Sequence, residues 1–422
     1  MQSRNRLIIL VSLFATTALG ESPKIDEKMD WPWWRGPSHL NKAAIGAQPV
    51  TEFSDSKHVL WKAPVSGRGH ASPTVMGNRI FLATSNQDKG TQSVVAFDRD
   101  SGKQLWIHDV NTGGLPGKIH AKNTHASSTI ACDGERLFCV FYNNNSLQVT
   151  ALGVSDGEPL WDERLGPYAP KRYEFGFAAS PLIHGDHVIV LGDSEEGGFL
   201  TALGREKGNR VWTTDRPKEM NFSSPIVAKL ADSEQLIISG CSRIAAYDPI
   251  TGKALWESKE AFTDVTCGTV VWEGDLIFAS GGFPKPLTIA VRAGTGETVW
   301  QNKKKSYEQS MLIHKGYLYT INDTGIAYCW RASDGEEMWS ERLKGPISAS
   351  PVLVEDLIYA ANEVGAFFVY KADPKKFELM ATNQLGDESF ATPTIIGNRI
   401  FARVTHLDDD GERSEMLYCL GK

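Results

Sequence analysis

The 422-residue chain is long enough for two or three ordinary domains, and its 41% hydrophobic content is that of a folded globular protein. Lysine and arginine total 44 against 51 aspartate and glutamate, which gives a net charge of −7. No strongly basic stretch stands out, so this balance excludes nucleic acid from the expected partners.

The N-terminus predicts an export signal over residues 1–20. Arg4 and Arg6 precede an apolar run that ends at Leu19, and Ala18 and Gly20 are small residues suited to signal cleavage. A run of about 13 residues is shorter than the roughly 20 that a spanning helix needs. The alternative is an uncleaved signal anchor; no cysteine follows the run to carry a lipid. We expect an exported protein, periplasmic or extracellular, with no transmembrane span in the mature chain.

Residues 21–57 form an aromatic arm ahead of the repeats. Trp31, Trp33 and Trp34 are interspersed with Pro32 and Pro37, which makes the segment stiff. We expect its rings to pack across the surface of the repeat domain; a free docking peptide is the alternative.

Residues 58–422 repeat one short pattern, a glycine followed four residues later by a tryptophan. The pairs are Gly102/Trp106, Gly157/Trp161, Gly208/Trp212, Gly252/Trp256, Gly296/Trp300 and Gly335/Trp339, and Trp61 precedes the first of them. Successive tryptophans lie 39 to 55 residues apart, a period typical of repeat architectures. Glycine permits a tight turn with positive φ, and the indole is expected to fill the wedge between neighbouring units. The seven tryptophans are therefore expected to be structural.

Each unit reads as four short antiparallel strands, which is one propeller blade. In the first unit the strands fall at residues 71–75, 80–83, 94–97 and 105–107, and a seventh unit is degenerate, with Leu379-Met380 in place of Leu-Trp. The last unit ends at Leu420 without a fourth strand, which Val59–Lys62 can supply. We therefore predict an all-β, eight-bladed propeller closed by its N-terminal strand. Seven blades is the alternative.

The six cysteines predict no disulfide or one. Most lie in apolar strand sequence, where a free thiol behaves as a small hydrophobe. Cys132 and Cys139 lie on the two strands of one hairpin and are the one pair expected to approach each other.

The repeat resembles that of the pyrroloquinoline quinone (PQQ)-like repeat proteins. The resemblance rests on segments such as Ala246–Trp256 and covers residues 58–422, and the Trp31–Pro37 segment is similar to the N-terminal part of exported bacterial members. The family includes quinoprotein dehydrogenases and the β-barrel assembly scaffold of bacterial outer membranes. It implies the eight-bladed propeller and leaves the activity open.

No cofactor is predicted. The dehydrogenases of this family carry a disulfide between adjacent cysteines, Ca²⁺ ligands and a catalytic aspartate, and this sequence has no adjacent cysteine pair. The run Asp408–Glu412 lacks the ligand spacing of a calcium loop and is expected to be a solvated turn. PQQ and Ca²⁺ are therefore alternatives without sequence support.

The candidate binding site is the channel face, where two long loops, residues 111–124 and 166–177, lead into innermost strands. Its candidate residues are His70, His120, Lys122, His125, Lys171, Arg172, Tyr173 and Phe175. Aromatic rings mixed with cations suit a protein or peptide, or an anionic envelope glycan. The alternative is two solvated loops that pack on each other. His70 and His125 lack an identifiable third metal ligand, so we expect them to be polar lining of the channel.

These features favour a non-catalytic binding or scaffold protein of the cell envelope over an enzyme. The first alternative is a quinone-cofactor-dependent oxidoreductase. A glycan-acting enzyme is a further alternative, and it would need two carboxylates roughly 5–10 Å apart at one mouth of the channel.

Overall fold

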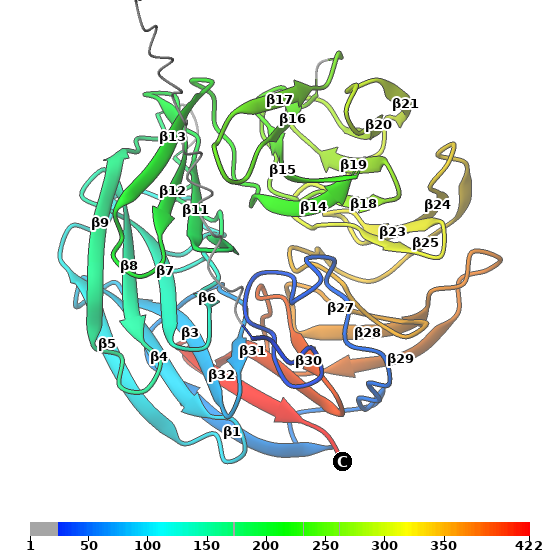
Figure 1. Ribbon diagram of the computed structural model, residues 1–422. Coiled ribbons are helices and arrows are strands. Elements are labelled where there is room, and N and C mark those ends of the chain that lie inside the picture. Colours follow the sequence, from blue (N-terminus) through cyan, green and yellow to red (C-terminus); the bar gives the residue numbers. More distant parts are fainter. Residues whose placement is uncertain (1–23, 172–173, 231, 261) are drawn as a thin grey trace, which may run out of the picture.

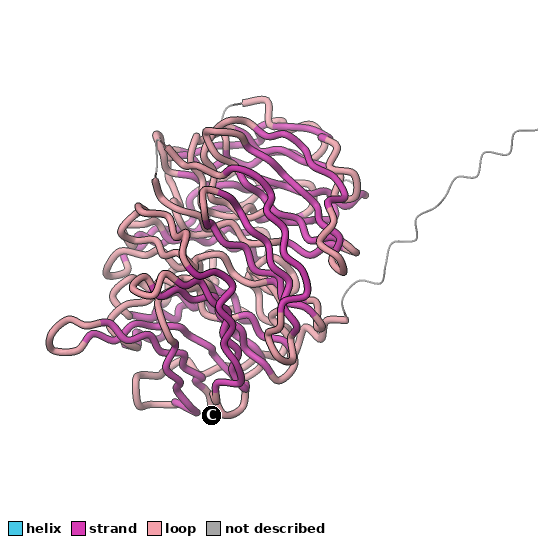
Figure 2. The backbone as a smooth tube through the Cα atoms, turned by 90° about the vertical axis from the view of Figure 1, so that its left-hand side faces the viewer, coloured by secondary structure: helices cyan, strands magenta, loops and turns pink. Residues whose placement is uncertain are grey.

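The computed structural model describes residues 24–171, 174–230, 232–260 and 262–422. Strands and loops make up all of these residues, and no helix occurs among them (Figure 2). Eight four-stranded antiparallel sheets surround a central axis (Figure 1). The predicted eight-bladed propeller is thus confirmed, and the seven-bladed alternative is wrong. The predicted export signal, Arg172 and Tyr173 lie outside the described residues.

Each blade runs from an innermost strand at the axis to an outermost strand at the perimeter. The first four blades are β2 (Thr74–Met76), β3 (Arg79–Asn86), β4 (Thr91–Asp98) and β5 (Gln104–Thr112); β6 (Ala131–Cys132), β7 (Arg136–Asn143), β8 (Ser146–Gly153) and β9 (Pro159–Pro167); β10 (Leu182–His184), β11 (His187–Gly192), β12 (Gly198–Gly204) and β13 (Arg210–Arg216); and β14 (Ile226–Leu230), β15 (Ser233–Gly240), β16 (Arg243–Tyr247) and β17 (Ala254–Glu257).

The other four blades follow the same order. They are β18 (Val271–Glu273), β19 (Leu276–Gly281), β20 (Leu287–Arg292) and β21 (Thr298–Asn302); β22 (Leu312–His314), β23 (Tyr317–Ile321), β24 (Ile326–Arg331) and β25 (Glu337–Arg342); β26 (Val352–Val354), β27 (Leu357–Ala361), β28 (Ala366–Lys371) and β29 (Leu379–Gln384); and β30 (Thr394–Ile396), β31 (Arg399–Leu407), β32 (Arg413–Leu420) and β1 (Val59–Val65).

The last blade joins the two ends of the propeller. Strand β1 pairs antiparallel with β32, and Trp61 lies opposite Cys419. The N-terminal strand therefore supplies the fourth strand that the last repeat lacks, as the sequence predicted, and it protects the edge of β32 from unwanted pairing.

A β-bulge precedes the tryptophan in the outermost strand of the repeat. In the first blade Trp106 pairs with Ala96 and Gln104 pairs with Phe97, so Leu105 has no partner across the ladder. The same shift occurs at the corresponding position of the other blades. A bulge turns the chain locally; here the unpaired Leu105 is 42% exposed, whereas the Trp106 side chain packs onto buried residues between blades.

In most repeats the glycine packs against the tryptophan of the preceding blade. A Cβ added at Gly157 would come within 2.6 Å of the Trp106 ring, and one at Gly208 within 2.5 Å of the Trp161 ring. Both glycines have positive φ, 74° and 69°. Glycine is therefore needed at this position for two reasons, the turn conformation and the close approach of an indole. The glycine and the tryptophan that touch belong to neighbouring repeats.

Later repeats keep this contact with some variation. Gly252 approaches the Trp212 ring, and a Cβ added at Gly335 would come within 2.6 Å of the Trp300 ring. The degenerate seventh repeat has no glycine at this position, and there the edge of the Phe377 ring meets Trp339 with centroids 5.4 Å apart. An aromatic side chain thus takes the place of the missing turn glycine.

The indole nitrogens add hydrogen bonds across the seams. Four of them donate to a backbone carbonyl of the following blade at 2.8–3.0 Å, namely those of Trp61, Trp161, Trp300 and Trp339. The buried Nε1 atoms of Trp106 and Trp212 have no hydrogen-bond partner among the described residues. At these two seams the indole therefore contributes by ring packing and not by a hydrogen bond.

The expectation that the indoles fill the wedge completely needs a correction. Trp300 is buried, with 8% exposure, but the six other repeat tryptophans are only partly buried: Trp61, Trp106, Trp161, Trp212, Trp256 and Trp339. They lie on outermost strands, so one side of each ring packs in the seam and another side meets solvent at the perimeter.

Trp256 departs furthest from this arrangement. Its indole Nε1 donates to Gln235 Oε1 at 2.7 Å within its own blade, whereas Trp161 Nε1 donates across the seam to Arg205 O at 2.9 Å. Gly296, in the next blade, meets the backbone of Glu257 in place of an indole ring. The seam between these two blades is therefore built differently from the others, which the repeat pattern does not reveal.

The aromatic arm packs on the propeller, and residues 30–41 of it cross the axis at one end of the channel (Figure 1). Trp31 pairs with Val75 of β2 and is 3% exposed, and the Pro32 carbonyl accepts the Cys132 N–H of β6. On the opposite side Ala43 N donates to Leu353 O of β26. We call this end of the channel the base; the rings of the arm form part of the core there.

All six cysteines are free. Cys132 lies opposite Leu137 in the hairpin ladder, so its partner across the strands is not Cys139. Burial raises the pKa of both thiols, that of Cys139 to about 12, which keeps them protonated and unreactive.

Candidate functional site

A ring of hydroxyl groups surrounds the channel axis, one from the start of each innermost strand. Its members are Ser72, Thr129, Ser180, Ser224, Thr269, Ser310, Ser350 and Thr392, and all are at least 94% buried. At six junctions the hydroxyl oxygen of one blade accepts the backbone N–H of the corresponding residue in the blade before it, at 2.9–3.1 Å. Because a hydroxyl has two acceptor sites and one donor, each of these groups keeps hydrogen-bonding capacity for the channel.

The ring opens into a cavity of about 230 Å³ on the axis. Trp34, from the arm, lies at its floor, where the indole Nε1 donates to Thr269 Oγ1 at 3.0 Å. Around the opening the wall is aromatic: the His70 ring stacks on Phe390 with centroids 4.5 Å apart, and Phe175 and Phe222 lie nearby. The base is covered by the arm, so the cavity is entered from the opposite end, which we call the mouth and define by residues 113–128, 166–171, 174–178 and 303–309.

Four of the predicted site residues line this cavity: His70, His120, Lys122 and Phe175. His125 does not; it lines a separate hollow of about 10 Å³ beside it. Lys171 is exposed and pairs with Glu196, away from the cavity lining. Sequence reasoning grouped these two residues with the other four because side-chain direction within a long loop has no repeat pattern to reveal it.

The tryptophans of the repeat lie away from this cavity. None of the seven belongs to its lining: Trp61, Trp106, Trp161, Trp212, Trp256, Trp300 and Trp339. Each of them lies on the outermost strand of its blade, whereas the cavity is bounded by innermost strands and by loops. The tryptophan that does line the cavity is Trp34 of the arm.

The two long loops pack on each other, as the alternative interpretation expected. Lys118 of the first loop forms an ion pair with Glu174 of the second, and the His120 ring meets the edge of Phe175 with centroids 5.0 Å apart. Asn123 Nδ2 also donates to the Phe175 carbonyl. The loops therefore form one connected rim at the mouth.

The lysines of this rim are neutralised by carboxylates. Besides the pairs of Lys118 and Lys171, Lys122 Nζ contacts Glu363 Oε1 at 2.7 Å, and Glu363 also accepts the Ser348 hydroxyl at 2.7 Å. Although partial burial acts against it, Glu363 raises the pKa of Lys122, so the lysine stays charged. The prediction of an anionic ligand counted these lysines as available, and the structure shows each of them already paired.

Glu308 is the carboxylate that lines the cavity itself. It is half-buried, and no ion pair joins it to any described residue. Burial raises the pKa of this carboxyl, with further contributions from Glu363 and Asp323, while the Ser348 hydroxyl and Lys122 act in the opposite direction. A carboxylate in such surroundings gains free energy from a positively charged partner.

His70 is an uncharged part of the wall. Burial, together with the positive charges of Arg68, Arg403 and Arg413, holds its pKa well below the usual value. Two of these arginines have carboxylate partners, since Arg403 Nε contacts Glu415 Oε2 at 2.8 Å and Arg413 pairs with Glu388. None of the three lines the cavity.

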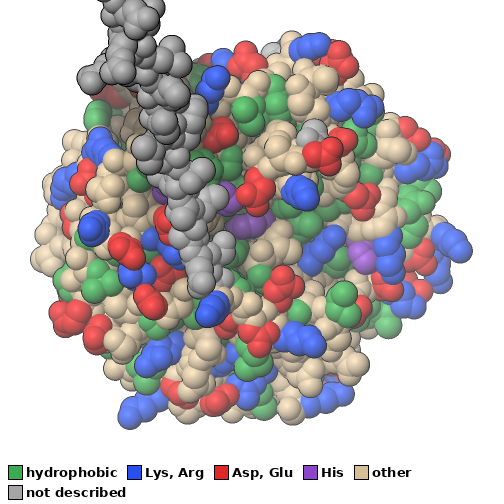
Figure 3. All heavy atoms as spheres, viewed as in Figure 1, with side chains coloured by type: hydrophobic (Ala, Val, Ile, Leu, Met, Phe, Trp, Pro, Cys, Tyr) green, Lys and Arg blue, Asp and Glu red, His purple; other side chains and the backbone are tan. Residues whose placement is uncertain are grey.

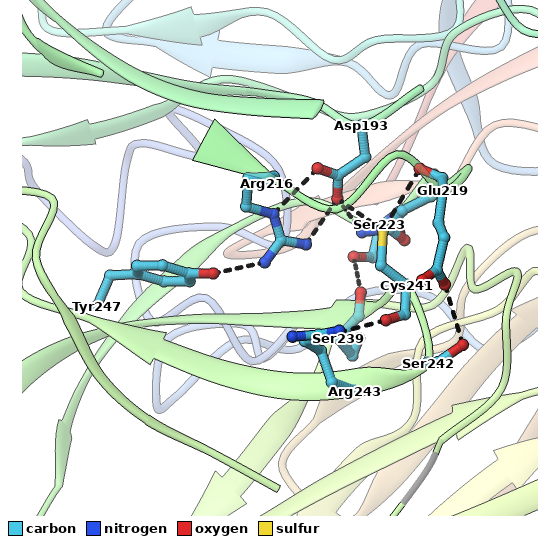
Figure 4. Close-up of polar contacts among 10 residues, drawn as sticks. Asp193, Arg216, Glu219, Ser223, Ser239, Cys241, Ser242, Arg243 and Tyr247 are labelled. Carbon is cyan, nitrogen blue, oxygen red and sulfur yellow. Dashed lines mark hydrogen bonds and ion pairs between the residues drawn. The ribbon is translucent and has the colours of Figure 1, made fainter. Parts of the chain in front are cut away.

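A buried polar cluster fixes the segment that carries Phe222 and Ser224 (Figure 4). Arg216 and Asp193 are fully buried and joined by two hydrogen bonds, of 3.0 and 2.7 Å, and Arg216 also donates to the Tyr247 hydroxyl at 2.8 Å. Asn221 donates to Asp193 Oδ2 at 3.1 Å and accepts the Ser223 N–H at 3.1 Å. Although burial acts to lower it, Asp193 raises the pKa of Arg216, so the guanidinium stays charged and its hydrogen bonds hold this part of the wall in place.

The donor set of the cavity does not fit PQQ and its Ca²⁺ ion. A tricarboxylate needs cations, and the one lysine that lines the cavity is paired with Glu363. Ca²⁺ takes six to eight oxygen ligands, whereas the described residues contain no cluster of three or more histidine, cysteine, aspartate or glutamate side chains with metal-binding geometry.

Sequence analysis missed the hydroxyl ring, Trp34 and Glu308 as parts of the site. The ring had a visible signal, since a serine or threonine before proline opens several repeats, as in Ser72-Pro73, Ser180-Pro181 and Thr392-Pro393. Trp34 and Glu308 had none, because each is unique to its own segment.

Comparison with known proteins identifies the family. A family model described as outer membrane protein assembly factor BamB matches residues 46–174 and 90–341, more than half of the chain. The chain belongs to this family. The BamB assembly factor of Moranella endobia is 24% identical over 351 residues, covering 79% of this chain and 82% of the relative. That of Burkholderia pseudomallei is 23% identical over 361 residues, covering 76% and 91%.

Solved structures share the fold. BamB from Moraxella catarrhalis superposes with a TM-score of 0.60 at 16% identity, over 85% of this chain and 96% of the other. A europium-containing methanol dehydrogenase gives a TM-score of 0.72 at 12% identity, over 94% and 98%. At these identities the likeness concerns the propeller alone, so the dehydrogenase carries no argument for its chemistry here.

None of the described residues forms a helix that is long and apolar enough to span a membrane. On the face shown in Figure 3, acidic and basic side chains are interspersed wherever the described residues are visible. This face therefore has no large field of one sign that would suit a polyanion.

Proposed function

We propose that this protein is an exported, non-catalytic scaffold of the cell envelope that assists the assembly of outer membrane proteins. The family match carries the proposal, because it spans most of the propeller and the relatives are named as outer membrane protein assembly factors. The pairing of the rim lysines and the donor set of the cavity also favour binding over catalysis.

We infer that the partner is a protein and that it binds at the mouth. The rim offers backbone and aromatic groups on two loops that brace each other, next to a preformed hollow. Loops that already contact each other around a concave surface lose less conformational entropy when a partner binds than separate loops would, which favours affinity.

Site-specific photo-crosslinking in the source cell tests this function. A photoreactive residue is placed at Ala121 or Lys171 on the mouth, and at Asn78, in the β2–β3 turn beside the base, as the control; all three positions are exposed. The expected result is a specific protein adduct from the mouth positions and none from Asn78. Adducts from Asn78 alone would place the partner on the other face, and a deletion strain with unchanged levels of outer membrane proteins would contradict the assembly role.

A further inference from the structure

The axial cavity combines one unpaired carboxylate with several aromatic rings. Glu308 contributes the carboxylate, and the rings include Trp34, Phe175, Phe222 and Phe390. Aromatic faces attract cations through their electron distribution, most strongly where water is excluded. Because Lys122, which also lines the cavity, is engaged by Glu363 at 2.7 Å, Glu308 is the lining carboxylate that no ion pair joins to a described residue.

The remaining lining groups are compatible with a positively charged ligand. Six of the ring hydroxyls accept one backbone N–H at the junctions described above, and each of these has a second lone pair, which can accept from a ligand N–H. The His70 ring is neutral and stacked on Phe390, so it extends the aromatic wall without adding charge.

The size of the cavity limits the ligand to a small group. Its volume of about 230 Å³ lies below the roughly 300–1,000 Å³ of pockets that hold drug-sized molecules. The aromatic groups lie along the wall and Trp34 closes the floor, so the ligand enters end-on from the mouth.

We propose that the axial cavity binds an organic cation, a guanidinium or alkylammonium group, with Glu308 as its counter-ion and the aromatic wall around it. The cation comes either from a free small molecule or from an arginine or lysine side chain of a bound protein. In the second case the inference rests on the proposed function, since that side chain belongs to the partner at the mouth.

Titration of the full-length protein with n-butylguanidinium and n-butylammonium tests this proposal. Binding is measured by calorimetry and by tryptophan fluorescence. Saturable binding is expected for both, with no binding of the matched neutral n-butanol or of butyrate. Glu308→Gln keeps the shape of the side chain and is expected to weaken binding ten-fold or more. Glu206→Gln, on an exposed turn that no described contact involves, is the matched control and is expected to bind as the wild type does.

Two results would overturn the proposal. One is the absence of saturable binding of either cation up to about 10 mM, ten-fold above a dissociation constant of about 1 mM. The other is equal affinity of the wild type and Glu308→Gln. If Glu308→Gln does not fold, Phe390→Leu takes its place: it removes an aromatic ring from the wall, a several-fold loss of affinity is expected, and unchanged affinity would count against the site.

A second titration distinguishes the two sources of the cation. The tripeptide Gly-Arg-Gly with blocked ends is compared with its citrulline analogue, which is neutral. If the arginine peptide competes with n-butylguanidinium and the citrulline peptide does not, the ligand is a protein side chain. If neither peptide competes while the free cation binds, the ligand is a small molecule. If the wild-type protein binds neither cation but still forms protein crosslinks at the mouth, the proposed function stands and this inference alone is overturned.

Discussion

The two ends of the channel are built on different principles. At the base, residues 30–41 are tied to the innermost strands by backbone hydrogen bonds and by buried rings such as Trp31. At the mouth, loops are joined by side-chain ion pairs, and Lys122 of the Lys122–Glu363 pair keeps 45% of its side chain exposed. The base therefore contributes to global stability, whereas the mouth can open locally without unfolding the ring.

Among substitutions that separate the two ends, Trp31→Ala at the base is expected to lower stability the most. The side chain is 3% exposed in the core cluster of the last and first blades, so its loss should lower the free energy of unfolding by about 3–5 kcal/mol. The measurement is the midpoint of urea denaturation. Ile45→Ala, in the same arm but 89% exposed, is the matched control. Equal midpoints for the two variants would show that the arm is not part of the cooperative unit.

Arg35→Leu, also at the base, should cause the next largest loss of stability. The guanidinium is fully buried and donates to the carbonyls of His39 and Met311, both at 2.9 Å. Two charged hydrogen bonds at about 1.5 kcal/mol each predict a loss of roughly 3 kcal/mol. Calorimetric unfolding would measure it, with exposed Lys28→Ala as the control. A loss as small as that of the control would mean that the arm relaxes to satisfy both carbonyls.

The base should also be sensitive to pH, through His39. The ring stacks on Trp33, and burial, followed by the charges of Arg35 and His184, lowers the pKa of His39 to about 4. Because the unfolded chain binds a proton near pH 6.5 and the folded chain does not, stability is full above about pH 6.5 and falls as the pH drops towards 4.

Denaturation midpoints between pH 7 and pH 4 would measure this dependence. Solvent screening of the partly exposed ring reduces the loss to about 1–2 kcal/mol. In His39→Asn, which suits the positive φ of 56°, the loss should be smaller by that amount. Identical pH profiles for the variant and the wild type would assign the pH dependence to other groups.

Lys122→Met at the mouth should have the smallest effect on stability, about 1 kcal/mol or less, because the lysine is largely exposed. Its effect is instead expected to be local, as faster amide hydrogen exchange in residues 113–128 with unchanged exchange in the innermost strands. Exchange that accelerates throughout the ring would show that mouth and base are not separable.

The fold could be predicted from the sequence because its signal is repeated. The Gly-x-x-x-Trp spacing encodes a turn, a bulge and a contact with the preceding blade, so each copy supports the same interpretation. The closure by Val59–Val65 followed from a strand missing at one end and a spare strand at the other. The motif does not record how each seam is completed, since Trp300 bonds across its seam, Trp212 has no such bond and Trp256 bonds within its own blade.

The site could be predicted only in outline. The channel face follows from the fold: His70 was found because it precedes an innermost strand, and Lys122 because it lies in a long loop that leads into one. The charge of the site could not be deduced, because it depends on which lysines meet carboxylates from distant blades, as Lys122 meets Glu363. Such pairs join residues 241 positions apart, and no local pattern records them.

The sheet that holds β1, β30, β31 and β32 also determines when the ring can close during synthesis of the chain. Strand β1 begins at Val59 and is made early, whereas its neighbour β32 ends at Leu420, about 360 positions later. Until β32 has been synthesised, the nascent chain is an open arc with β1 unpaired at its leading end. A chain that is cut short by even its last strand therefore loses the seam that makes the arc a ring.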